Sequence, residues 1–409
     1  MENVSGDNAW MLVATAMAML MTWGLALFYG GLVRQRNALS TMMYVFVAMV
    51  VVSLQWTLVG YSLAFGDSFG GLIGNSHYAF LRDVGFLPRD DQNISQLGFM
   101  CFQMMFAIIT PALVAGAIAE RMKLSAFALF AALWSTIVYA PLAHWVWNPE
   151  GWLAKLGALD YAGGTVVHIS AGFSALVAAW VVGPRLKSAD RSAHDLRLAF
   201  IGAGLLLVGW VGFNAGSALK ADDLAILASV NTYLAAMAAA GAWMIIDRIE
   251  SGKVTVLGAL SGMVAGLVAI TPAAGYVQPV AAILIGLTAG WIVCLGIRFT
   301  RWLDLDDTLD VFGLHGVAGV VGVLLTGVFA TTAMNSNAGV RDGLAYGEHG
   351  IGLLLSQSVA VIVSAAWSVG WTYLILRFVK IATGLRVEDE DESRGLDDAI
   401  RGEQATSLL

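Results

Sequence analysis

The chain has 409 residues, of which 58% are hydrophobic and 12% are charged, and its formal net charge is −7. Soluble domains carry about 25% charged residues, so this composition excludes a soluble globular protein and predicts an integral membrane protein. Apolar runs of about 20 residues recur along the chain, whereas the short alternating pattern of a membrane β-barrel is absent. We therefore predict an all-α fold that spans a lipid bilayer.

Taken in chain order, the apolar runs predict eleven transmembrane helices. Their approximate ranges are 8–31, 39–65, 97–119, 124–147, 163–183, 198–219, 224–249, 256–272, 280–299, 311–333 and 350–377. The eighth range is the weakest of these predictions, because it is short and ends at Thr271 and Pro272.

The basic residues are distributed unevenly between the two sides of these predicted spans. One side carries seventeen of the 22 Lys and Arg residues, and the other carries only Arg82, Arg89, Lys155, Lys220 and Arg341. Basic loops remain on the cytoplasmic side of a membrane. We therefore expect the N-terminus outside and the C-terminus in the cytoplasm, an arrangement that requires an odd number of spans.

Eleven spans divide into two groups of five and one final helix. The segment GLALFYGGL in the first span resembles GWVGFNAGSAL in the sixth, which favours an internal repeat. Two five-span copies must insert in opposite orientations, as in many transporters. We predict two inverted five-helix repeats plus one final helix, forming a membrane domain over residues 1–380, and a cytoplasmic C-terminal tail over 381–409. From composition alone, the acidic tail is equally compatible with disorder.

Two histidines lie inside predicted spans, each a few residues after an aspartate. His168 follows Asp160 in GALDYAGGTVVHIS, and His315 follows Asp310 in DVFGLHGVAG. A lone histidine in an apolar helix is more often a core residue whose hydrogen bonds are satisfied. Ionisable groups in lipid are costly, however, so two histidines in the predicted fifth and tenth spans indicate a polar pathway. Imidazole can pass on a small hydrogen-bonding solute or relay a proton. By chain position, the two histidines should differ in depth by about 15 Å.

Aromatic residues gather near the outer ends of the predicted spans. Phe102 and Phe106 are one helical turn apart and share a face, and Phe213 lies beside glycines. Spacing alone favours core packing for these rings, although a cluster that includes Trp147 would hold a small cation by cation–π attraction. Asp160 is a candidate helix N-cap, and its carboxylate would also favour a cation close by.

Other chemistry is not indicated. The sequence has no metal-ligand spacing, nucleotide-binding loop, nucleophile elbow or nucleic-acid-binding pattern. Its two cysteines, Cys101 and Cys294, lie in apolar runs and predict buried thiols rather than a disulfide. We expect neither an enzyme nor a cofactor, a metal site or a nucleic-acid partner.

Several long motifs resemble one family. LDYAGGTVVHIS, GWVGFNAGSAL, AGLVAITPAAGY, DVFGLHGVAG and the closing GLRV and GLD stretches are similar, in order, to the ammonium transporter (Amt/Mep/Rh) family. The resemblance extends from Ala9 to about Asp398. Trp147 places the chain with the bacterial and archaeal Amt branch, because Rh proteins generally lack that tryptophan.

The resemblance implies a role for each matching residue. His168 and His315 correspond to the twin histidines of a hydrophobic pore, and Phe106 and Phe213 correspond to the stacked gate above it. The outer recruitment site for ammonium corresponds to Trp147, Phe102, Ser217, Phe106 and Asp160. Trp210 and Thr271 correspond to supporting positions nearby.

The resemblance also implies an assembly and partners. Members of the family are homotrimers in the plasma or inner membrane, conduct ammonium or ammonia with methylammonium as an analogue, and support nitrogen utilisation. A PII-type signalling protein can dock on their cytoplasmic face. Arg401 stands where the family usually has a histidine, and no tyrosine follows it, so the end of the tail departs from the family pattern that accompanies PII binding. An ammonium sensor that uses the same fold and signals through its tail is the alternative function.

Overall fold

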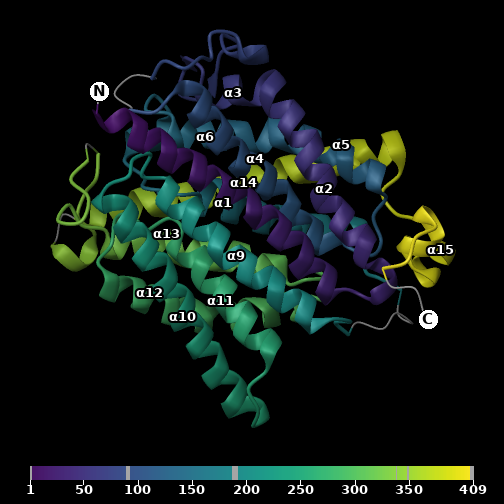
Figure 1. Ribbon diagram of the computed structural model, residues 1–409. Helices are drawn as coiled ribbons and strands as arrows, with labels where there is room; N and C mark the ends of the chain where they lie inside the picture. Colours follow the sequence, from purple (N-terminus) through teal and green to yellow (C-terminus); the bar gives the residue numbers. More distant parts are fainter. Residues whose placement is uncertain (1, 89–92, 187–191, 338, 348–349, 406–409) are drawn as a thin grey trace.

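The computed structural model describes residues 2–88, 93–186, 192–337, 339–347 and 350–405. Helices dominate this part of the chain and lie side by side (Figure 1). The α-helices are α1 (Glu2–Leu32), α2 (Ala38–Gln55), α3 (Tyr61–Phe65), α4 (Gln96–Ile118), α5 (Leu124–Trp134), α6 (Ala140–Trp147), α7 (Trp152–Leu156), α8 (Ser170–Val182), α9 (Leu196–Gly216), α10 (Asp223–Ser251), α11 (Val256–Ile270), α12 (Pro279–Trp302), α13 (Ala318–Phe329), α14 (Gly350–Thr383) and α15 (Asp389–Arg394).

Short 3₁₀ and π segments interrupt or extend these helices. The 3₁₀ turns are η1 (Gln35–Asn37), η3 (Ala79–Leu81) and η7 (Leu344–Tyr346), and the π-helical segments are η2 (Trp56–Gly60), η4 (Ser135–Tyr139), η5 (Gly164–Ile169), η6 (Phe312–Val317) and η8 (Asp397–Arg401). Strands β1 (Ser68–Phe69) and β2 (Ile73–Gly74) form a small antiparallel sheet in which Ser68 pairs with Gly74. The described chain is therefore all-α apart from this hairpin.

The predicted spans can be compared with helix length. Within the described residues, ten helical segments are long and apolar enough to cross a membrane, so this is a multi-pass membrane protein. The predicted eighth span coincides with α11, whose 15 residues cover about 22 Å at 1.5 Å per residue. That is less than the roughly 30 Å of a hydrocarbon core. The total of eleven spans, their inverted repeats and their orientation remain predictions.

Glycines allow helices that are far apart in the sequence to approach closely. Helix α1 packs along α9, and a Cβ at Gly202 on α9 would lie 2.3 Å from the amide nitrogen of Phe28 and 2.7 Å from the carbonyl oxygen of Gly24. A Cβ at Gly172 on α8 would lie 2.1 Å from the amide nitrogen of Gly316 in η6. Any side chain at Gly172 or Gly202 would push these helices apart, as expected where backbones touch.

The two ends of the helix bundle differ. We call the end at which α1 begins, which also carries β1, β2 and α7, the N-terminal face. Helix α1 runs from this face to the opposite end, where α15 lies (Figure 1). We call that second end the tail face, because α14 ends there and the C-terminal tail folds against it.

The tail is ordered over most of its length, in contrast to the disordered alternative. After α14, the chain turns at Gly384, which has φ +70°, and then forms α15 and η8. Glu392 and Asp397 of this segment are buried. Composition suggested disorder because the tail has no apolar periodicity, but hydrogen bonds to the membrane domain and ion pairs within the tail hold it instead. Residues 406–409 lie outside the described residues.

Candidate functional site

A cluster of aromatic side chains lies near the N-terminal face, where α4, α6 and α9 converge. Phe106 of α4 and Phe213 of α9 stack with ring centroids 3.8 Å apart and planes inclined by 17°. Trp147, the last residue of α6, contacts Phe106 edge-on at 5.7 Å, and Phe102 contacts Phe106 at 5.0 Å. The three phenylalanines are buried, whereas Trp147 is partly exposed. The three phenylalanine rings thus form a buried layer, and the tryptophan lies on the more exposed side of that layer.

Ser217 follows the last turn of α9 beside this layer. Its hydroxyl donates a hydrogen bond to the carbonyl oxygen of Phe213, at 2.9 Å. The ring of Phe102 lies so close to Gly216 that a Cβ there would be 2.7 Å from it. Ser217 and Phe102 are therefore neighbours across the contact between α4 and α9, which brings the predicted recruitment residues together.

Asp160 acts as the cap of the first histidine-bearing helix. Its carboxylate accepts hydrogen bonds from four backbone N–H groups, those of residues 163, 164, 165 and 166, at 2.6 to 3.2 Å. The hydroxyl of Thr165 also donates to it. Trp147 donates its indole N–H to the carbonyl oxygen of Asp160 at 2.9 Å. The Asp160 carboxylate thus caps the start of η5, although Gly163 occupies the N-cap position itself, and the carbonyl oxygen of Asp160 holds the tryptophan in place.

Trp210 connects the aromatic layer to the histidines. Its ring lies 6.1 Å from that of Phe213 and stacks on His168 at 5.3 Å with planes inclined by 22°. The indole N–H donates to the hydroxyl of Thr271 at 2.8 Å, and that hydroxyl donates to the carbonyl oxygen of Leu267 at 2.7 Å. Thr271 therefore fixes the orientation of Trp210 and does not itself contact the histidines through these bonds.

His168 and His315 meet in the centre of the bundle. They are 1% and 3% exposed, their rings stack at 5.4 Å, and their Nδ1 atoms are 3.3 Å apart. The depth difference of about 15 Å expected from chain position is wrong. That estimate assumed that each span starts at a bilayer surface, but η5 and η6 both begin after loops whose residues Asp160 and Asp307 are already buried.

The close approach of the two imidazoles restricts their protonation. A hydrogen bond between two Nδ1 atoms needs one N–H donor and one unprotonated acceptor. The pair can therefore hold one additional proton, whereas two would place two N–H groups against each other. His168 Nε2 is buried and has no hydrogen-bond partner within the described chain. It is thus available to a solute as a donor or an acceptor, depending on which ring carries the shared proton.

A narrow cavity of about 10 Å³ lies against the histidine pair. That volume is about the minimum that holds one water-sized molecule. Apart from the histidines and Trp210, its wall is apolar or aromatic: Met21, Leu25, Phe28, Tyr29, Ile109, Leu113, Val167, Leu206, Val264 and Leu314. Tyr29 donates its hydroxyl to the carbonyl oxygen of Leu113 at 3.0 Å. Sequence reasoning missed these residues, because an apolar side chain that lines a pore has the same signal as one in a core.

The site has no features of a metal centre. Among the described residues, no group of three or more His, Cys, Asp and Glu side chains is placed to hold a metal ion. Cys101 and Cys294 are both free thiols. The chemistry available at the site is that of aromatic faces, a hydroxyl, a capped carboxylate and two imidazoles.

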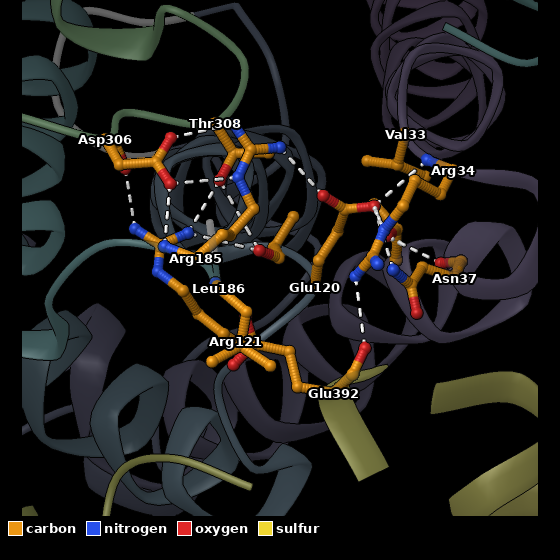
Figure 2. A network of polar contacts seen from close by, with 12 residues as sticks. Val33, Arg34, Asn37, Glu120, Arg121, Arg185, Leu186, Asp306, Thr308 and Glu392 are labelled. Atoms are coloured by element: carbon orange, nitrogen blue, oxygen red, sulfur yellow. Dashed lines mark hydrogen bonds and ion pairs between the residues drawn. The ribbon is translucent and has the colours of Figure 1, made fainter. Parts of the chain in front are cut away.

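A second polar network holds the tail face together (Figure 2). Glu120 accepts hydrogen bonds from Arg34 at 2.9 Å, from Asn37 at 2.8 Å and from Arg185 at 2.7 Å. Burial alone would raise the pKa of Glu120, but Arg34, Arg185 and Asn37 outweigh it and hold the pKa below its ordinary value. The carboxylate therefore remains charged throughout the neutral range. It joins its own connection, between α4 and α5, to the connection between α1 and α2 and to the connection between α8 and α9.

The tail joins this network through its own carboxylates. Glu392 accepts from the backbone N–H of Leu186 at 2.7 Å and from Arg386 at 2.5 Å, and its carbonyl oxygen accepts from Arg34 (Figure 2). Asp397 accepts from the backbone N–H groups of Leu39 and Ser40 at 3.0 and 2.7 Å. Asp397 thereby caps the start of α2, although it lies more than 350 residues further along the chain.

The chain matches known proteins over nearly its whole length. A sequence model of the Ammonium Transporter Family matches residues 9–406. An ammonium transporter of Bacillus subtilis (strain 168) is 46% identical over 402 residues, covering 98% of this chain and 98% of its own. Ammonium transporter Amt1 of Archaeoglobus fulgidus is 45% identical over 394 residues, covering 96% and 97%.

Solved structures agree in fold. Mep2 of Saccharomyces cerevisiae has a TM-score of 0.88 at 36% identity, covering 94% of this chain and 88% of its own. A structure described as a sensor Amt protein has a TM-score of 0.90 at 33% identity, covering 98% of this chain and 100% of its own.

Proposed function

Because this chain belongs to the ammonium transporter family, we propose that it carries ammonium across the membrane. The relatives reported above are named transporters rather than enzymes. The observation that carries the proposal is the series of rings from Trp147 through Phe106, Phe213 and Trp210, which ends at two imidazoles in contact. The series leads to a cavity with room for one small molecule.

The first step of the proposed mechanism is recruitment at the N-terminal face. A small cation is attracted to the faces of Trp147 and Phe106, and the hydroxyl oxygen of Ser217 accepts one of its N–H groups. Phe102 completes the apolar wall. Asp160 acts through the backbone and Trp147, because the capping bonds already occupy its carboxylate.

The second step is loss of a proton below the recruitment site. The stacked rings of Phe106 and Phe213 close the way to the histidines, so a solute passes only when these side chains move. Beyond them the cavity is narrow and mostly apolar, and burial penalises a charged form much more than a neutral one. Ammonium therefore gives up a proton, which passes to the histidine pair, and proceeds as ammonia.

The third step uses the histidine pair. Ammonia hydrogen-bonds to the unpartnered Nε2 of His168 as it passes. Because the pair accommodates one additional proton, it can receive the proton at one ring and release it from the other, exchanging donor and acceptor roles at the two Nδ1 atoms. Net movement of ammonia together with a proton follows from this sequence.

The test is ammonium-evoked charge movement in proteoliposomes that contain the purified protein. We expect a saturable current in the wild type and its loss, or loss of selectivity, in the double variant His168→Ala, His315→Ala. Internal pH is recorded in parallel. Charge movement that survives the double substitution with its selectivity unchanged would overturn the role of the histidines.

We also propose the setting in which the protein works. The N-terminal face lies outside, the tail face lies in the cytoplasm, and the protein is a homotrimer in the plasma or inner membrane. Apolar side chains exposed on outer helices, such as Trp180, Ile226 and Trp291, are available for lipid and subunit contacts. Native mass measurement in detergent tests the trimer, and tail-specific proteolysis of sealed vesicles tests the orientation.

For the tail we propose a regulatory role, with a PII-type signalling protein as the partner. The GLRV and GLD stretches fold against the membrane domain, and Arg401 donates to the hydroxyl of Ser40 at 2.9 Å. The residue that departs from the family pattern therefore takes part in tail packing. Co-elution of the purified protein with a PII protein on size-exclusion chromatography tests this partner.

A sensor is the second candidate, favoured by the likeness to the sensor Amt protein and by a tail bound to several connections of the bundle. A sensor would bind ammonium and change tail accessibility without passing ammonia. In the same vesicles, ammonium binding without a current and without an internal pH change would favour the sensor over the transporter.

A further inference from the structure

A second cavity, of about 540 Å³, lies at the tail face directly below the histidine cavity. The two share wall residues Phe28 and Leu314, so a solute that leaves the histidines past these two side chains enters the larger cavity. Its wall comes from α1, α10, α11 and α12 and from the loop between α12 and η6. Carboxyl groups are prominent in this wall.

Most of these carboxylates have partners. Arg185 binds both oxygens of Asp306, and Arg121 donates to the carbonyl oxygen of Asp306 at 2.6 Å and to the hydroxyl of Thr308 (Figure 2). The remaining pairs in the same wall are Asp310 with Arg301, Glu250 with Arg298, and Asp247 with Thr255. These contacts fix the loop from Asp304 to Asp310 and leave its third aspartate, Asp307, as the exception.

Asp307 differs from its neighbours. It is 7% exposed, and its Oδ2 atom accepts the backbone N–H of Phe312, at 2.8 Å. Its Oδ1 atom is buried and has no hydrogen-bond partner in the part of the chain that the structure describes. A buried acceptor left unpaired costs about 1–3 kcal/mol, so its persistence in a cavity wall marks a position where a ligand atom or proton belongs.

The charges around Asp307 set its protonation. Burial raises its pKa, and so does the charge of Asp310, while the N–H groups of Phe312 and Val311 and the cation of Arg121 act in the opposite direction; the result is a pKa of about 7. Both forms are therefore populated near neutral pH, which suits a group that exchanges protons. Tyr29, which lines the histidine cavity, interacts electrostatically with Asp307 from α1.

We propose that Asp307 is the proton-exchange group at the inner exit of the conduction path, an inference that rests on the proposed transport of ammonium. Its carboxylic O–H bond breaks as ammonia takes the proton and becomes ammonium, and the carboxylate left behind holds the new cation by charge. The cation then moves into the cavity. A hydronium ion from the cavity returns the proton and leaves water, so the sum is ammonia plus hydronium giving ammonium plus water.

The experiment uses the full-length protein in proteoliposomes with the internal pH set between 5.5 and 8.5. An ammonium gradient is applied, and the initial charge movement and internal pH change are recorded. We expect the wild-type rate to change with internal pH around a midpoint near 7. Asp307→Asn should lower the rate at least about tenfold, as when a general acid is removed, and abolish that dependence.

Two further variants separate proton exchange from a structural effect. Asp304→Asn removes a carboxylate from an exposed position on the same loop, and we expect it to keep the wild-type profile. Asp307→Glu restores an ionisable group, and we expect pH dependence to return with a displaced midpoint. A purely structural role for Asp307 would change the rate of its variants without changing the pH profile.

The outcomes distinguish this inference from the proposed function. A wild-type profile in Asp307→Asn overturns the role of Asp307 and leaves ammonium transport standing, whereas a wild type that moves no ammonium overturns both. If Asp307→Asn does not fold, infrared difference spectra of the wild type decide the question. A protonated-carboxyl band that disappears as the pH rises through about 7, and that Asp304→Asn retains, supports the proposal, and its absence at pH 6 overturns it.

Discussion

Replacement of Asp160 by asparagine tests whether its carboxylate works by holding the backbone. In the wild type, Oδ1 accepts the N–H groups of Gly163 and Gly164, and Oδ2 accepts those of Thr165 and Val166 together with the Thr165 hydroxyl. An asparagine offers one oxygen, so either orientation points its NH₂ group at donors on the other side. At least two charge-assisted bonds are lost.

The cost follows from those two bonds. Hydrogen bonds to a charged group contribute about 1.5–3 kcal/mol each, so Asp160→Asn should destabilise the protein by about 3–6 kcal/mol. With an unfolding entropy of about 2.1 cal/mol/K per residue, a chain of this length should melt about 5 °C lower. Transport should fall as well, because Trp147 hydrogen-bonds to the carbonyl oxygen of Asp160.

Thermal unfolding in detergent, followed by intrinsic fluorescence, measures the shift. The matched control is Asp222→Asn, since Asp222 caps the exposed start of α10 with bonds to Leu224 and Ala225; asparagine caps helices as well as aspartate does, so its melting temperature should hardly change. An Asp160→Asn variant that melts like the wild type but no longer transports would refute this reasoning. Asp160 would then act through its charge on the cation.

Four more predictions follow from the same contacts. Trp147→Leu should reduce selection of ammonium over potassium in competition currents with little change in melting temperature, and unchanged selectivity would contradict the recruitment site. Gly172→Val should separate α8 from η6 and abolish conduction, because a Cβ already meets the Gly316 nitrogen at 2.1 Å, whereas Gly204→Ala, with nothing within 4 Å, should be silent. Glu392→Gln should weaken charge-assisted bonds by about 2 kcal/mol and speed tryptic cleavage of the tail about 30-fold; an unchanged rate would show that Glu392 does not retain it. For Asp307, the pKa of about 7 in the folded state exceeds the ordinary 3.8, so the stability that its protonated form contributes is present at acid pH and is lost as the pH rises towards 7. The free energy of unfolding of the wild type should therefore fall by about 3 kcal/mol relative to that of Asp307→Asn between pH 5 and pH 8. Melting temperatures of the two proteins that change equally between these pH values would contradict this.

The sequence predicted the membrane class and most helix positions because long apolar runs have few other interpretations. It predicted the aromatic residues and the histidines through their motifs, and the structure brings them together. It did not predict that His168 touches His315. That contact depends on loops that enter the protein before η5 and η6 begin, and hydropathy does not distinguish a buried loop from the end of a span.

The tail and the pore wall show two other limits of sequence reasoning. Glu392 is buried against Leu186 and Arg34, which hydrogen-bond to it from more than 200 residues away in the sequence, and a composition rich in acidic residues carries no information about such distant partners. Tyr29 lines the cavity from within an ordinary apolar helix. A single polar atom at the end of an aromatic ring leaves no periodic signal, so only the three-dimensional arrangement identifies it.

The cap that Asp397 provides to α2 has a consequence for biosynthesis. A ribosome translates α2 more than 350 residues before Asp397, so the N–H groups of Leu39 and Ser40 have no carboxylate acceptor from the tail until that aspartate has been made. Water must serve these groups in the meantime. The start of α2 therefore gains its cap only after Asp397 has been translated, and a chain truncated before residue 397 would keep its membrane helices yet leave these two N–H groups without that carboxylate.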